Sequence, residues 1–89
     1  MNYRITNSAE ADRDLVSFVK SGNKRALKKI KDLMASIVET PYYGIGKPEA
    51  LKYELSGLWS RRIDRENRLI YEVREEEKII KIVSLKGHY

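Results

Sequence analysis

The spacing of apolar residues predicts a first helix from Asn7 to Lys20. One face of this helix would carry apolar residues at three- and four-residue intervals, namely Ala11, Leu15, Phe18 and Val19. Asn7 is suited to accept a backbone hydrogen bond at the start, with Glu10 three places on as in a capping box. Gly22 follows the last periodic residues, and we expect it to end the helix.

A second helix is predicted from Lys24 to Val38, with Asn23 as its N-cap. Its apolar stripe is formed by Ala26, Leu27, Ile30, Leu33, Met34, Ile37 and Val38. The remaining surface is basic and carries Lys24, Arg25, Lys28, Lys29 and Lys31. Such a face is more often a solvated surface than a phosphate-binding one. The short turn between the two predicted helices indicates an antiparallel hairpin.

The period of the pattern changes after the segment TPYYGIGK, Thr40 to Lys47, whose proline and glycines indicate a loop. Alternating or β-branched segments then predict three strands, at Trp59 to Ile63, Leu69 to Val73 and Lys78 to Leu85. Tyr3 to Thr6 is a candidate further strand. Helices followed by a meander of antiparallel strands predict an α+β fold, and the 89 residues indicate a single domain, 1–89.

Composition narrows the chemistry that the chain can perform. There is no cysteine and only one histidine, which excludes disulfides, thiolate metal sites and a His-rich zinc site. The chain has 18 Lys and Arg against 13 Asp and Glu, a net charge of +5 that favours an anionic partner. No signal peptide or membrane-spanning pattern is present, and we expect a cytoplasmic protein with no cofactor and no membrane partner.

Basic residues concentrate in the middle of the chain, in KPEALKYELSGLWSRRIDRENRLIY. Alternation along the first strand of this segment would place Trp59, Arg61 and Ile63 on one face and Arg62 on the other. Arg62 and Arg68 share a face only if the turn between their strands holds an odd number of residues, for example three.

With a three-residue turn at Arg65-Glu66-Asn67, Asp64 would face Arg68 and Arg62 would face Ile70. Two adjacent cations with no evident structural reason indicate an anion between them. The alternative is that both arginines are neutralised in ordinary surface ion pairs, by Asp64, Glu66 and Glu72.

The only histidine, His88, is the penultimate residue and is followed by Tyr89. The last predicted strand would deliver both to one end of the sheet, although a lone histidine is more often an ordinary surface residue. Metal-independent RNA cleavage needs a base, an acid and cations where negative charge develops. Aromatic residues on which a base could stack are also present, at Tyr42, Tyr43, Tyr53 and Tyr89. Composition makes RNA cleavage one candidate among several.

The stretch TPYYGIGKPEALKYELSGLWSRRIDRENRLIYEV, together with the terminal HY, resembles the YoeB branch of the RelE toxin superfamily. Those proteins are the mRNA-cleaving toxins of bacterial YefM–YoeB toxin–antitoxin pairs, and the resemblance covers roughly the second helix to the C-terminus. It implies a RelE-like fold with two N-terminal helices packed on a twisted antiparallel sheet. It also implies metal-independent mRNA cleavage in the ribosomal A site and inhibition by a YefM-like antitoxin, and it leaves a homodimer open.

The resemblance further implies a role for each residue of the site. By motif position, Glu49 would be the general base and Lys52 would contact phosphate. Arg62 and Arg68 would stabilise the transition state. The terminal residues would act as general acid and as substrate-positioning group, His88 and Tyr89 respectively.

Two other classes of function stay open from the residues alone. A non-catalytic RNA- or ribosome-binding module, including a toxin that binds the ribosome without cleaving, would need the arginines but neither Glu49 nor His88. A structural interaction module, whose charge serves only an acidic partner helix, would cleave no RNA.

Overall fold

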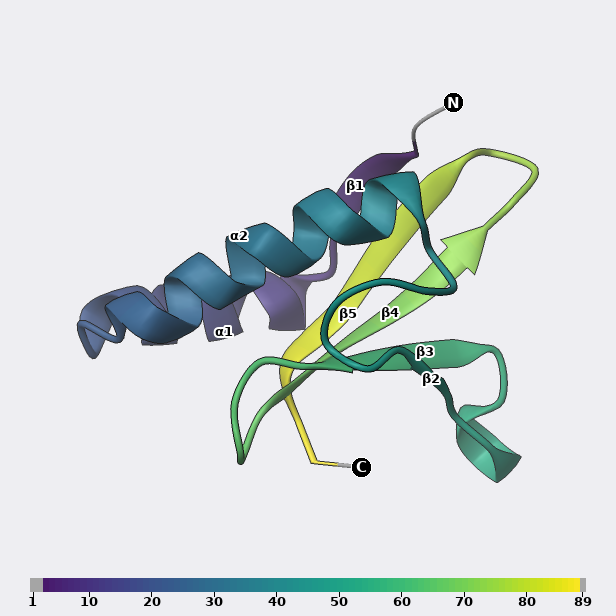
Figure 1. Cartoon of the computed structure of the whole chain (residues 1–89). Coiled ribbons are helices and arrows are strands. Elements are labelled where there is room, and N and C mark those ends of the chain that lie inside the picture. The colour runs from purple at the N-terminus through teal and green to yellow at the C-terminus, as the bar shows by residue number, and fades with distance from the viewer. Residues whose placement is uncertain (1–2, 89) are drawn as a thin grey trace.

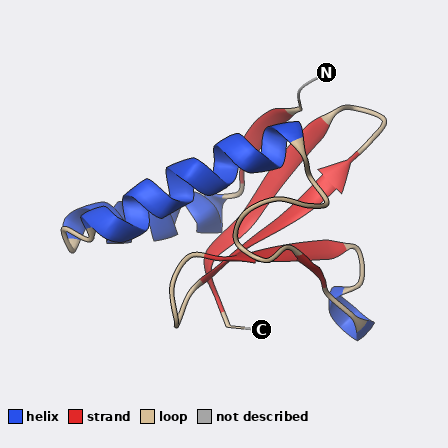
Figure 2. Cartoon of the chain, viewed as in Figure 1, coloured by secondary structure: helices blue, strands red, loops and turns tan. Residues whose placement is uncertain are grey.

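The computed structural model describes residues 3–88 and contains two helices packed on a five-stranded sheet (Figures 1 and 2). The helices are α1 (Ala9–Lys20) and α2 (Lys24–Glu39). The strands are β1 (Arg4–Asn7), β2 (Glu49–Ala50), β3 (Leu58–Arg62), β4 (Arg68–Arg74) and β5 (Ile79–Gly87). A short 3₁₀ helix, η1 (Tyr53–Leu55), lies between β2 and β3. The α+β fold expected from the sequence is confirmed, and neither described helix has the length and apolar character needed to cross a membrane.

The sheet has the strand order β1-β5-β4-β3-β2 and is mixed. Strands β3, β4 and β5 form the expected antiparallel meander, and β2, which the sequence pattern did not predict, pairs antiparallel with β3. The candidate N-terminal strand is present, and it pairs in parallel with β5, with Arg4 opposite Ile79. This parallel strand is an addition to the expected meander, and it brings the start of the chain beside the last strand.

The start of α1 differs from the prediction. Ser8 is the N-cap, and its Oγ accepts a hydrogen bond from the Ala11 backbone N–H at 3.0 Å. Asn7 cannot cap the helix because it is still part of β1. Val19 was expected on the packed face, yet 58% of it is exposed. Asn23 caps α2 as predicted.

The apolar core lies between the helices and one face of the sheet. It is built from Ala11, Phe18, Ala26, Ile30, Leu33, Ile37, Ile63, Leu69, Tyr71, Ile80, Ile82 and Leu85. Because side chains alternate along a strand, Ile70 points to the opposite face from Leu69 and Tyr71. Its strand partners there are Ser60 and Ser84, and all three of these residues are buried. This second face carries the residues considered below.

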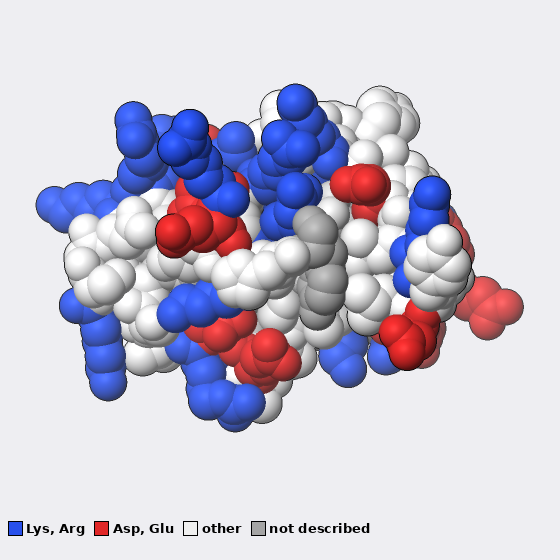
Figure 3. Space-filling view, turned by 90° about the horizontal axis from the view of Figure 1, so that it is seen from below, with Lys and Arg blue, Asp and Glu red and all other residues white. Residues whose placement is uncertain are grey.

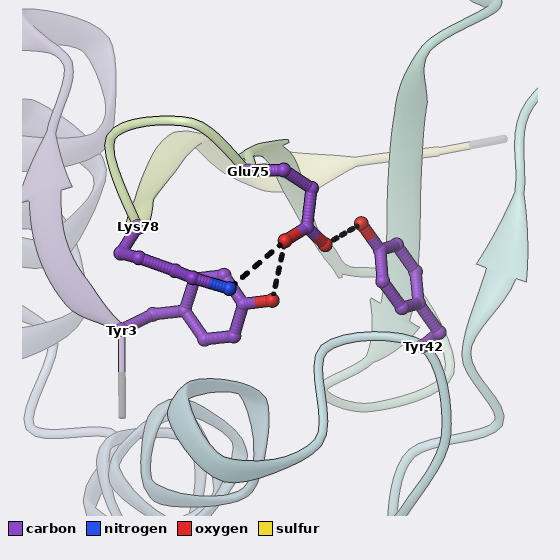
Figure 4. Close-up of polar contacts among 4 residues, drawn as sticks. All are labelled: Tyr3, Tyr42, Glu75 and Lys78. Atoms are coloured by element: carbon purple, nitrogen blue, oxygen red, sulfur yellow. Dashed lines mark hydrogen bonds and ion pairs between the residues drawn. The ribbon is translucent and has the colours of Figure 1, made fainter. Parts of the chain in front are cut away.

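The turn between β4 and β5 is tied to two distant segments by Glu75 (Figure 4). Its carboxylate accepts hydrogen bonds from the hydroxyls of Tyr3 and Tyr42, and it lies 3.4 Å from Lys78 Nζ. The two tyrosine hydrogen bonds lower the pKa of Glu75. Burial, and then the bond to Glu75, raises the pKa of Tyr42 to about 12. Glu75 therefore joins the N-terminal segment and the loop after α2 to the sheet.

Candidate active site

The β3–β4 hairpin places the two candidate arginines directly opposite each other, with Arg62 paired to Arg68. Directly opposed residues share a face of the sheet, so the expected common face is confirmed. The expected register is wrong, because Arg62 does not face Ile70, whose β3 partner is Ser60. The connection runs over residues 63–67, which is an odd number but longer than the three residues expected.

The longer connection is stabilised by Asp64, which lies in the loop and does not face Arg68 as expected. Its Oδ1 accepts hydrogen bonds from the backbone N–H groups of Glu66 at 2.9 Å and Asn67 at 2.7 Å. Burial raises the pKa of the Asp64 carboxyl, but the hydrogen bonds from Asn67 and Glu66 outweigh it and the pKa is lowered. Asp64 thus stabilises the turn between β3 and β4.

Neither arginine forms an ion pair with a carboxylate among residues 3–88. Glu72 pairs with Arg74 at 3.1 Å. The alternative in which acidic neighbours neutralise the two arginines is therefore not supported. In addition, Nη1 of Arg68 is buried and has no hydrogen-bond partner within the described residues. Opposed like charges destabilise a strand pair, so this arrangement fits a site that receives an anion.

His88 is brought beside Arg68 by an irregularity at the end of β5. Ser84 pairs with Ile70, whereas Gly87 pairs with Arg68. An advance of three residues along β5 therefore corresponds to only two residues along β4, which is a β-bulge. Such a bulge redirects the strand that carries it. The strand runs to Gly87, two residues beyond the predicted end, and the exposed His88 follows.

An open pocket of about 430 Å³ is lined by Arg65, Glu66, Arg68 and His88. The sequence predicted Arg68 and His88 as site residues, whereas it placed Arg65 and Glu66 only in the turn, with Glu66 as a possible surface partner of the arginines. Both lie in the connection between β3 and β4, residues 63–67. Tyr89 lies outside the described residues.

Glu49 and Lys52 approach from the other side of the arginine pair. Glu49 is exposed on the edge strand β2 and pairs with Ser60 of β3, so it shares a face with Arg62 two residues on. With strands about 4.8 Å apart, its backbone lies roughly 12 Å from that of Arg68, with Arg62 between them. Lys52 is exposed just beyond β2, before η1.

The arrangement combines an exposed carboxylate and two arginines on one face of the sheet with an imidazole in the pocket beside Arg68. Seen from below the view of Figure 1, the molecule shows Lys and Arg side chains spread over this face, with Asp and Glu between them (Figure 3). No three His, Asp or Glu side chains within residues 3–88 are grouped so that they could hold a metal ion. The groups present suit proton transfer and stabilisation of negative charge.

One residue that the sequence analysis did not single out is central to the architecture. Arg61 was counted with the basic segment, but it is completely buried. The signal was present in the alternation, which placed Arg61 on the same face as Trp59 and Ile63.

Comparison with known proteins identifies the family. A family model for the YoeB-like toxin of bacterial type II toxin–antitoxin systems matches residues 7–89, which extends the similarity through α1. The Toxin YoeB of Streptomyces coelicolor is 41% identical over 86 residues, covering 97% of this chain and 99% of the relative.

Solved structures agree in sequence and in fold. A YoeB dimer from Staphylococcus aureus is 43% identical, with a TM-score of 0.87 and 100% coverage of both chains. A YoeB–YefM complex from the same organism is 44% identical, with a TM-score of 0.83 and the same 100% coverage. The chain belongs to the YoeB-like toxins of bacterial type II toxin–antitoxin systems.

Proposed function

We propose that this toxin is an endoribonuclease that cleaves mRNA in the ribosomal A site, in the cytoplasm, without a metal cofactor. The observation that carries the proposal is the pair Arg62 and Arg68, opposed on neighbouring strands with no carboxylate partner in residues 3–88. His88 shares a pocket with Arg68, and Glu49 lies on the same face across Arg62. In this proposal Glu49 is the base, the arginine pair supplies the cations, and His88 is the acid.

In this mechanism Glu49 removes the proton from a ribose 2′-OH, and the freed oxygen attacks the adjacent phosphorus. The guanidinium groups of Arg62 and Arg68 stabilise the negative charge that builds on the phosphate oxygens. The imidazolium of His88 gives its proton to the departing 5′-oxygen. The products are a 2′,3′-cyclic phosphate and a free 5′-hydroxyl.

Two further groups would hold the substrate. The exposed Lys52 would contact a neighbouring phosphate, and Tyr89, outside the described residues, would position the nucleotide.

We also propose a YefM-like antitoxin as the partner that inhibits this toxin, and a homodimer as one of its forms. Relatives from Staphylococcus aureus that are 43–44% identical have been solved as a YoeB–YefM complex and as a YoeB dimer. Similarity over the full length of both chains supports the transfer of both partners.

The test is cleavage of a defined mRNA on programmed ribosomes, mapped by primer extension. Glu49→Gln, Arg68→Gln and His88→Gln should each slow cleavage by roughly 10²–10⁴-fold while circular dichroism and antitoxin binding stay unchanged. Arg74→Gln is the matched control, because it removes an exposed arginine from the far end of the same strand as Arg68. It should cleave like the wild type.

Three results would count against the proposal. Wild-type cleavage by folded His88→Gln would remove the acid. Ribosome binding without any cleavage would favour the non-catalytic module instead. Products that lack a 2′,3′-cyclic phosphate would exclude attack by the 2′-oxygen.

A further inference from the structure

We propose that Arg61 is a positioning residue for Glu49, acting through the loop of residues 40–48. This inference rests on the proposed function, because it concerns the residue assigned there as the base. Arg61 touches no substrate in this proposal. It holds the loop that leads into β2 and thereby fixes where the Glu49 carboxylate stands.

All five N–H donors of the buried Arg61 guanidinium are used, which is unusual for an arginine without a carboxylate partner. The Nε group donates to the Tyr71 hydroxyl at 3.1 Å. The other acceptors are the Ser36 hydroxyl and the backbone carbonyls of Ile45, Thr40 and Tyr43, at 2.6 to 3.1 Å. Its charge is therefore balanced mainly by loop carbonyl dipoles.

Tyr71 extends the same network to a fourth loop carbonyl. Its hydroxyl accepts from Arg61 and donates to the Pro41 carbonyl at 2.6 Å. The carbonyls of residues 40, 41, 43 and 45 thus all point to one buried Arg–Tyr pair. Among the described residues, the backbone bonds of this loop outside the network are few, and one of them joins Tyr43 N–H to Thr40 O at 3.4 Å.

The glycines of the loop are explained by the same contact. A Cβ on Gly44 would lie 2.5 Å from Ser36 Oγ and 3.1 Å from Arg61 Nη1. A Cβ on Gly46 would lie 2.6 Å from a Leu33 methyl group and 3.1 Å from the Cβ of Arg61. The loop packs so closely around Arg61 that the guanidinium determines the path of the loop backbone.

The loop in turn determines the position of Glu49. Strand β2 has only two residues, and so short an edge strand has little stability of its own. The loop backbone reaches it directly, and the Arg62 N–H donates to Gly46 O at 2.8 Å just before β2 begins. A shift of the loop away from Arg61 would therefore move Glu49, while Arg68 on β4 and His88, which follows β5, would stay in place.

A purely structural Arg61 predicts a different result from a positioning one. If the network only stabilises the protein, weakening it affects all variants alike. If it positions the base, weakening it has no further effect once the base has been removed. A double-mutant cycle separates the two cases, because only coupled residues are non-additive.

The experiment weakens the network with Tyr71→Phe, and separately with the milder Ser36→Ala, in wild-type, Glu49→Gln and His88→Gln backgrounds. Single-turnover cleavage is measured on programmed ribosomes, well below the melting temperature of every variant. Ser21→Ala is the matched control for Ser36→Ala, since it removes a serine hydrogen bond to the Phe18 carbonyl at the end of α1, away from the loop.

We expect Tyr71→Phe to slow cleavage on the order of 10-fold in the wild-type and His88→Gln backgrounds, and Ser36→Ala to act in the same direction. In the Glu49→Gln background the same changes should have almost no effect. An equal loss in all three backgrounds, or no loss from either variant, would overturn the positioning role. Wild-type cleavage by Glu49→Gln alone would instead refute the proposed base, which is a separate failure of the proposed function.

Discussion

Gly87 allows β4 and β5 to approach closely where the candidate site begins. A Cβ at this position would lie 2.7 Å from Cγ1 and 2.8 Å from Cδ1 of Ile70, and 3.3 Å from the carbonyl oxygen of Arg68. Carbon atoms make ordinary contact at about 3.5–4.0 Å, so the two strands would have to separate by roughly 0.7 Å or more. Gly87→Ala is therefore a steric perturbation of the strand that carries His88.

The expected magnitude follows from the rigidity of the surroundings. Ile70 is 1% exposed and cannot swing aside, so relief must come from movement of the end of β5. Inserting a methyl group into such packing costs about 1–3 kcal/mol of unfolding free energy, and each kcal/mol lowers the melting temperature by about 4–8 °C. A displacement near 1 Å at a catalytic group can cost up to about 10²-fold in rate, so cleavage should fall by roughly 10–100-fold.

The assay combines chemical denaturation with cleavage on programmed ribosomes, and Ile70→Ala provides the control. It removes both atoms that the new methyl group would meet, and by itself should cost about 2–5 kcal/mol. In Gly87→Ala/Ile70→Ala the added methyl group occupies part of the vacated space. The double variant should therefore be more stable than the sum of the two single changes predicts, and it should cleave faster than Gly87→Ala. Wild-type behaviour of Gly87→Ala, or strictly additive losses, would refute this reasoning.

Three further changes test other parts of the structure. Burial and the bond to Glu75 raise the pKa of Tyr42 from its ordinary value of 10.0 to about 12. The protonated Tyr42 hydroxyl therefore stabilises the fold fully below pH 10.0, and this stabilisation is lost as pH rises towards 12. The difference in melting temperature between wild type and Tyr42→Phe should shrink over that interval. Ser8→Ala should cost about 1–2 kcal/mol in urea unfolding, since Ser8 caps α1 and also donates to the Val83 carbonyl; a loss below about 0.3 kcal/mol would contradict this. A tag fused after Tyr89 should slow cleavage far more than an N-terminal tag, without loss of antitoxin binding; equal rates would argue against a site at His88.

The sequence pattern predicted the positions of helices and strands better than it predicted which strands pair with each other. The apolar stripe of α2 could be recognised in the sequence because its buried residues recur at helical spacing. The parallel pairing of β1 with β5 joins segments separated by the whole chain, and no local period reports such a pairing. The cap of α1 was misplaced by one residue for a related reason, because Asn7 is retained in the sheet by its pairing with Ile82.

The strand register at the candidate site also could not be predicted in full from the sequence pattern. Alternation predicted a shared face for Arg62 and Arg68 only if the turn holds an odd number of residues, and the connection 63–67 meets that condition. The length of the turn depends on Asp64, whose carboxylate bonds two backbone N–H groups and extends the loop to five residues, 63–67. From its charge alone Asp64 is a candidate ion-pair partner for the arginines, but its carboxylate accepts backbone hydrogen bonds instead. The roles of Glu49 and His88 came from the family resemblance, not from the pattern.

Arg61 and Arg62 show why residue type alone does not identify a site. They are neighbours in the sequence, and alternation turns them to opposite faces of β3. Arg61 meets five acceptors in the core, so its guanidinium has no donor left for a substrate. Arg62 is exposed and lies opposite Arg68, and in the proposed function the phosphate of the bound RNA supplies its acceptors. What distinguishes the buried arginine from the exposed one is the number of acceptors within reach, and three of the five acceptors of Arg61 belong to a loop sixteen to twenty-one residues away from it in the chain.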